Sequence, residues 1–158
     1  SDVLQAQFEA VQAIPLKKPF SEVFTLLQTK AIDGQENTWS NTYSKKFFEV
    51  QKYATETNHG VLDYMVVTSA EFWYGLPDDV RTKLKTAMDE AIAHGNRIAL
   101  KKGAEDRQKI IDSGKTEILT ITEAERQQWV NAMKPVWKMF ADEIGPDLIG
   151  AALEANNP

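Results

Sequence analysis

The sequence predicts a helix-dominated α/β fold, and three observations carry that prediction. Apolar residues recur at helical spacing from Pro77 to about Ser113, which indicates one long helix. Thr122 and Glu125 form a T-x-x-E capping box ahead of a second amphipathic pattern. The run VLDYMVVT, residues 61–68, is rich in β-branched and aromatic residues over the length of a strand.

The elements expected before residue 61 are short. The spacing of Leu4 and Phe8 predicts a helix capped by Ser1 or Asp2, and a second helix is expected to begin at Ser21. The next segments are expected to be a short helix over 39–47 and a strand over 48–55. Residues 14–18 contain a proline and are expected to form an edge strand or an extended link.

After residue 68 the pattern is mainly helical. The long helix is expected to bend near Gly95 or Gly103, because glycine weakens a helix interior. Pro135 is expected to kink the last long helix. The other expected elements are helical turns over 69–76, a strand over 116–121 and a final short helix over 147–155.

Composition excludes several classes of protein. A net charge of -5 argues against a nucleic-acid partner. The absence of cysteine excludes a disulfide framework, a thiolate metal site and a thiol nucleophile. No apolar run approaches the roughly 18 residues of a membrane span. Because the sequence opens SDVLQAQF without a methionine, we expect a processed, trimmed or excised piece.

Catalytic chemistry finds no support in the sequence. No G-x-S-x-G motif or glycine-rich phosphate loop occurs, so no nucleophile and no cofactor is predicted. The histidines, His59 and His94, lack partners at ligand spacing, so no metal site is predicted. An enzyme using Asp33 or Glu36 is the weakest of the function classes, and the protein is expected not to be an enzyme.

The stretch DGQENTWSN, residues 33–41, is the best candidate for a binding site. Asn37 and Asn41 supply amide groups, and Trp39 and Phe20 can supply an apolar wall, as a site for a small carboxylate requires. The cation of such a site is not evident. An asparagine-rich turn with a solvent-facing tryptophan is the alternative interpretation. His59 is interpreted either as a turn residue or as a ligand contact.

Four runs of sequence resemble one known family. They are FSEVFTLLQTKAIDGQENTWSNTYSKKFFEVQKY, TNHG, FWYGLPDDVR and SGKTEILTITEAERQQWVNAMKPVWKMF. Together they resemble the C-terminal half of a TRAP-transporter periplasmic solute-binding protein of the DctP family. The resemblance implies a periplasmic receptor with two α/β lobes that close on an organic acid. It also implies membrane permease subunits as partners.

The resemblance also suggests which residues bind the ligand. The family's asparagine in D-G-Q-E-N falls on Asn37, and its ligand-facing aromatic falls on Phe20, with Trp39 and Asn41 beside the pocket. An arginine that clamps the ligand carboxylate is expected just upstream of Ser1, outside this sequence. C4-dicarboxylates are the first expected ligands, and sugar acids such as uronates or sialic acid remain the alternative.

By the same resemblance, residues 1–62 and 103–158 are assigned to the second lobe. Residues 63–102 would cross into the first lobe, most of which is absent, with the long bent helix spanning the two. The strand at 61–68 would then have unpaired edges, so a homodimer or exchanged assembly is expected to cover residues 63–102. A structural or interaction fragment that binds no solute is the rival interpretation.

Overall fold

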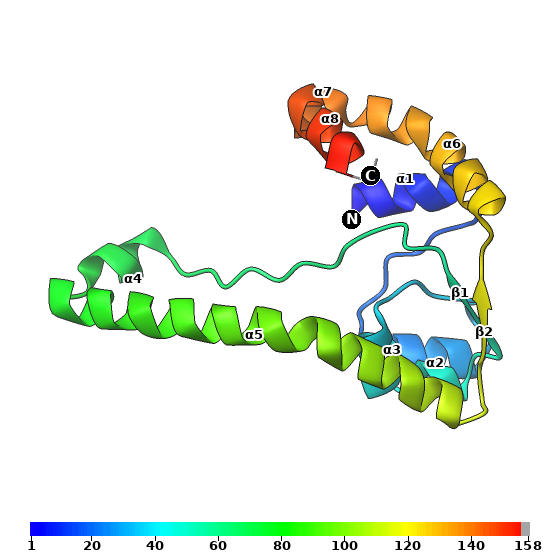
Figure 1. Ribbon diagram of the computed structural model, residues 1–158, viewed down its shortest axis with the longest axis horizontal. Helices are drawn as coiled ribbons and strands as arrows, with labels where there is room; N and C mark the ends of the chain where they lie inside the picture. Colours follow the sequence, from blue (N-terminus) through cyan, green and yellow to red (C-terminus); the bar gives the residue numbers. More distant parts are fainter. Residues whose placement is uncertain (156–158) are drawn as a thin grey trace. The chain divides into compact units, whose positions relative to one another are not determined.

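The computed structural model describes residues 1–155 and is dominated by helices (Figure 1). The last three residues of the expected 103–158 lobe segment lie outside the described part. Two short strands, β1 (Tyr53–Glu56) and β2 (Glu117–Thr120), form a two-stranded sheet. The helices are α1 (Asp2–Ala10), α2 (Val23–Gln28), α3 (Trp39–Ser44), η1 (Phe47–Glu49), α4 (Ala70–Gly75), α5 (Asp78–Asp112), α6 (Glu123–Met139), α7 (Ala141–Ile144) and α8 (Pro146–Ala155). The predicted helix-dominated α/β class is confirmed.

The chain divides into two compact units. The first comprises Ser1–Phe20 and the segment from Thr120 onward, and the second comprises Ser21–Leu119. The lobe boundaries inferred from the family resemblance concern a larger, intact receptor, and they stay a prediction.

In the first unit, α1 packs against α6. The Ser1 side chain caps α1, and both halves of the Thr122–Glu125 capping box are formed at the start of α6, as predicted. The helix runs continuously past Pro135 and ends at Met139. The predicted amphipathic helix is therefore divided, because a non-helical residue separates α6 from α7.

In the second unit, α3 packs against α5. The fully buried side chains include Phe47 and Ile110, which places the core at the C-terminal turns of α5. Figure 1 shows α2 and α3 beside this end of α5, with α4 at the other end. The helix continues through Gly95 and Gly103, and its axis changes direction along its course (Figure 1).

The strand predicted over 61–68 is wrong. These residues have no regular secondary structure, and Val61 and Met65 are 87% and 85% exposed. Their composition suits a half-buried sheet, but a strand also requires a neighbour to pair with its backbone. No segment among residues 1–155 pairs with it.

The strand predicted over 48–55 is also shorter than expected, since β1 begins at Tyr53. Thr116 donates its hydroxyl to the carbonyl oxygens of Phe48 and Gln51, at 2.8 and 2.9 Å. These bonds hold the preceding residues in a helical turn and a loop. Residues 14–18 form an extended link and no strand.

Candidate ligand-binding site

The polar stretch predicted as a site forms the entry to α3. Thr38 caps the helix by accepting a hydrogen bond from the Asn41 backbone N–H at 3.3 Å. The Asn41 side-chain amino group donates to Asn37 Oδ1 at 2.6 Å, and the Thr38 N–H donates to the same oxygen at 3.3 Å. The carbonyl end of Asn37 is thus occupied, which leaves its amino group as the donor for a ligand.

Trp39, the first residue of α3, lies against a charged pair. The Arg107 guanidinium lies 5.7 Å from the centre of the Trp39 ring, a cation–π arrangement. Arg107 also donates two hydrogen bonds to the carboxylate of Glu56, at 2.7 and 2.8 Å. These bonds, opposed by burial, lower the pKa of Glu56, and Trp39 contributes to the lowering. Trp39 is half-buried, so its ring is only partly exposed to solvent.

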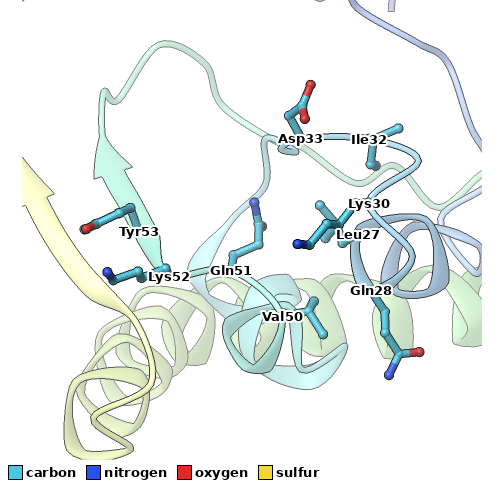
Figure 2. Close-up of a pocket in the computed structure, with 9 residues that line it drawn as sticks. All are labelled: Leu27, Gln28, Lys30, Ile32, Asp33, Val50, Gln51, Lys52 and Tyr53. Carbon is cyan, nitrogen blue, oxygen red and sulfur yellow. The ribbon is translucent and has the colours of Figure 1, made fainter.

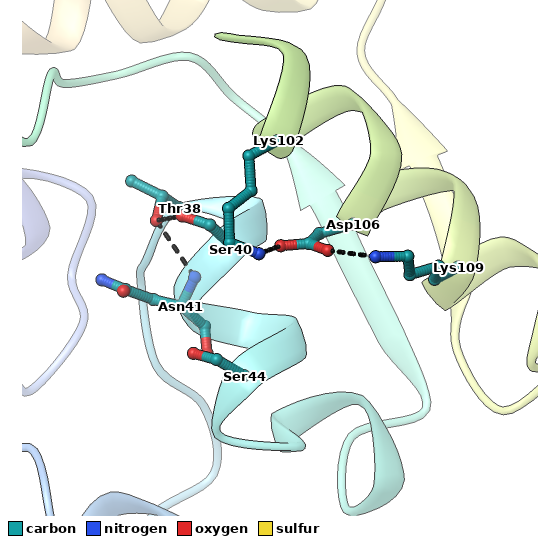
Figure 3. Close-up of polar contacts among 7 residues, drawn as sticks. All are labelled: Thr38, Ser40, Asn41, Ser44, Lys102, Asp106 and Lys109. Carbon is teal, nitrogen blue, oxygen red and sulfur yellow. Dashed lines mark hydrogen bonds and ion pairs between the residues drawn. The ribbon is translucent and has the colours of Figure 1, made fainter. Parts of the chain in front are cut away.

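A buried carboxylate lies on the face of α5 near α3. Asp106 has no exposed surface and is held by Lys102 and by Lys109, the latter at 2.9 Å (Figure 3). Burial raises the pKa of Asp106, but its hydrogen bonds to the two lysines outweigh burial, so the pKa is lowered. Because Asp106 fixes the Lys102 ammonium, a positive charge is held close to α3.

Lys102 and Asn41 line the same cavity. This cavity has a volume of about 280 Å³ and is lined by Ser40, Asn41, Ser44, Tyr64, Ala99 and Lys102. Figure 3 shows Lys102 extending from α5 toward Ser40. Hydroxyls, an amide and an ammonium around one cavity are groups that can bind a small anion.

A larger hollow of about 490 Å³ lies elsewhere in the second unit (Figure 2). It is lined by Leu27, Gln28, Lys30, Ile32, Asp33, Val50, Gln51, Lys52 and Tyr53, and it contains none of the five predicted ligand residues. Its lining comes from two stretches of the chain, residues 27–33 and 50–53. We therefore take the α3 entry, and the adjoining smaller cavity, as the candidate site.

The two remaining predicted site residues, His59 and Phe20, do not line the cavity beside α3. His59 Nδ1 lies 2.6 Å from the Thr57 hydroxyl, and its Nε2 lies 3.6 Å from a Glu36 carboxylate oxygen. Asn58 before it has φ 47°, a left-handed conformation. Both interpretations of His59, as a turn residue and as a ligand contact, stay predictions. Phe20 belongs to the first unit, where it is 40% exposed. Its role as a ligand contact stays a prediction.

Sequence reasoning missed the cations of the second unit. The spacing of Lys102, Asp106 and Lys109 is the i,i+4 and i,i+3 spacing of helical ion pairs, which could have indicated the cluster. The Arg107–Glu56 pair joins residues far apart in the sequence, so no local pattern indicates it. Within residues 1–155, no group of side chains suited to a metal ion occurs, and no helix is long and apolar enough to cross a membrane.

The Asp106 cluster makes stability depend on pH. The pKa of Asp106 is lowered from its ordinary value of 3.8, so its contribution is complete above that pH and is lost as pH falls through the lower, folded-state pKa. At neutral pH, Asp106→Asn should therefore reduce the free energy of unfolding by about 1–3 kcal/mol, the range for a hydrogen-bonded buried charge. The difference from wild type should shrink below pH 3.8. Urea unfolding followed by circular dichroism at several pH values measures both effects.

Asp89→Asn is the matched control, because Asp89 pairs with Lys85 at i,i+4 but is exposed. Its cost should stay below about 0.5 kcal/mol. Equal costs for the two variants would contradict the assignment of Asp106 as a buried structural charge.

With this geometry in place, the chain can be compared with known proteins. The family model described as "Bacterial extracellular solute-binding protein, family 7" matches residues 1–143. The C4-dicarboxylate-binding periplasmic protein DctP of Shewanella loihica is 66% identical over 99% of this chain and 46% of the relative. Its counterpart from Vibrio cholerae is 53% identical over 99% of this chain and 47% of the relative.

Solved structures of solute-binding proteins are also similar to this chain. A TRAP periplasmic solute-binding protein from Shewanella oneidensis, with bound succinate, has a TM-score of 0.96 and 66% identity over 99% of this chain and 52% of that chain. One from Pseudomonas aeruginosa, with bound L-malate, has a TM-score of 0.84 and 39% identity over 87% of this chain and 48% of that chain. The chain spans about half the length of the curated relatives that it matches. The family resemblance is confirmed: the chain belongs to family 7 of the bacterial extracellular solute-binding proteins, the DctP family.

Proposed function

We propose that this chain forms part of a periplasmic TRAP-transporter receptor that binds a C4-dicarboxylate. The observation that carries the proposal is the succinate-bound structure from Shewanella oneidensis, with 66% identity and a TM-score of 0.96. The malate-bound structure from Pseudomonas aeruginosa supports the same ligand class. In this role the protein is a receptor and not an enzyme, and it delivers its ligand to membrane permease subunits.

Sugar acids are the alternative ligands. The 2,3-diketo-L-gulonate-binding protein of Escherichia coli and the sialic acid-binding protein of Vibrio cholerae are 35% and 32% identical to this chain. Both identities are far below those of the two C4-dicarboxylate-binding relatives, 66% and 53%. We therefore place a C4-dicarboxylate before a sugar acid.

The α3 entry offers the chemistry that a carboxylate needs. The Asn37 amino group can donate a hydrogen bond, because the Asn37 carbonyl oxygen already accepts from Asn41 and Thr38. In the proposal, Lys102 supplies positive charge near Asn41, and an arginine upstream of Ser1 supplies the bidentate clamp. Trp39 and His59 border the site in this proposal.

The Asn37 substitution tests this proposal in the intact receptor. Asn37→Ala should weaken succinate binding by about 10- to 150-fold, because a hydrogen bond to a charged group contributes about 1.5–3 kcal/mol. Isothermal titration calorimetry with succinate, malate and a uronate measures the loss and ranks the ligands.

Asn131→Ala is the control, since Asn131 is an exposed asparagine on α6 whose side chain accepts hydrogen bonds from Gln127 and Lys134 on the same helix. Unchanged succinate affinity in Asn37→Ala would remove Asn37 from the site. If the wild-type receptor prefers the uronate, its ligand is a sugar acid and not a C4-dicarboxylate.

A second candidate function is assembly without ligand binding. It is favoured by the exposed apolar run that contains Val61 and Tyr64–Val67, whose backbone is unpaired in the described chain. A β-prone segment with free backbone groups is a template for another chain. In this proposal a second copy of the chain covers residues 63–102.

Light scattering of this chain tests the assembly. The wild-type chain should have the mass of a dimer, and Met65→Asp should shift it toward the monomer, because a charge would be buried in the interface. Met139→Asp is the control, since Met139 is also exposed, at 69%, but lies in α6 outside residues 63–102. A monodisperse wild-type monomer would exclude the homodimer.

A further inference from the structure

Arg107 joins three elements of the second unit that are separated in the sequence. It lies on α5 and makes its two hydrogen bonds, at 2.7 and 2.8 Å, to Glu56, the last residue of β1. Its guanidinium lies 5.7 Å from the ring centre of Trp39, the first residue of α3. One side chain thus ties the start of α3 to both α5 and β1.

The pair has the features of a specific contact. A bidentate arginine–carboxylate interaction fixes direction as well as distance, because the guanidinium is a rigid fork. The side chains of Arg107 and Glu56 are only 33% and 20% exposed, so solvent screens them less than an ordinary surface pair. By contrast, Arg126 and Glu123 form an equally bidentate pair within α6, with 49% and 73% exposed.

The helix that Arg107 contacts, α3, depends on its neighbours for its orientation. α3 is six residues long, and a helix of that length has little stability of its own, so its orientation depends on packing. Trp39 stands between Asn37 and Asn41, whose side chains are bonded to each other at 2.6 Å. Any rotation of Trp39 relative to α5 would move both asparagines together.

We propose that the Arg107–Glu56 pair is the positioning device of the ligand site: it fixes Trp39, and through it the orientation in which Asn37 and Asn41 meet a carboxylate. Arg107 and Glu56 are positioning residues that do not themselves touch the ligand. The pair also gives Trp39 a structural role beside the wall role expected from the sequence. The ligand part of this inference rests on the proposed function.

The test compares two matched pairs in the intact receptor. Arg107→Lys keeps the charge but loses the fork, and Glu56→Gln keeps the shape but loses the charge. Arg126→Lys and Glu123→Gln make the same changes in the exposed pair of α6. Each variant is measured where circular dichroism shows it fully folded, so lost stability is not read as lost affinity.

Amide hydrogen exchange reports the positioning of α3, and succinate affinity reports its effect on the ligand site. Amide hydrogen exchange of residues 38–44 without ligand should become about tenfold faster in Glu56→Gln, and succinate affinity should fall by about tenfold, as expected for a lost charged hydrogen bond. Arg107→Lys should show the same pattern with smaller changes. The two α6 variants should leave both quantities unchanged.

Unchanged exchange over residues 38–44 in both Arg107→Lys and Glu56→Gln would overturn the positioning role, whatever happens to affinity. Faster exchange with unchanged affinity would overturn the link from α3 to the ligand. If the wild-type receptor binds neither succinate nor malate, the proposed function fails separately. The exchange readout then still decides whether the pair orients α3.

Discussion

Asp106 is a carboxylate without exposed surface, held between two lysines on the helix that packs against α3. A buried charge is tolerated only when it is paired, so Lys102 and Lys109 are required where they lie. All three residues lie on α5, so the cluster holds the two ammonium groups in place along that helix. The candidate site depends on this constraint, because Lys102 lines the same cavity as Asn41. Arg107, the next residue, presents its guanidinium to Trp39 from the same turn of the helix.

The second unit therefore has two unlike ends. At the C-terminal end of α5, Asp106 and Ile110 are buried, and polar groups converge on α3. Toward the other end, Leu84 and Ile92 are exposed. A helix of 35 residues is about 52 Å long, so Leu84, near its start, is well separated from Asp106. We interpret the polar end as the part that contributes to a ligand site and the apolar end as a surface for another chain segment.

How much the sequence predicts depends on how local each interaction is. The helices follow from apolar spacing and caps such as Thr122 with Glu125, which act within one turn. Asn37 and Asn41 were found because they are four residues apart and share a turn. The prediction of a strand at 61–68 was wrong because a strand requires a neighbouring segment to pair with, and a local sequence pattern does not show whether one is present. Arg107 and Glu56 went unnoticed for the same reason, since only the fold brings α5 to β1.

We propose that the α3 entry presents Asn37 to a ligand carboxylate. A crystal structure of the intact receptor with succinate tests it most directly. The account predicts the Asn37 amino group within about 3 Å of a succinate oxygen, with the bonds from Asn41 and Thr38 to the Asn37 carbonyl oxygen retained. Succinate bound in the hollow beside Tyr53, or with Asn37 out of contact, would contradict the account.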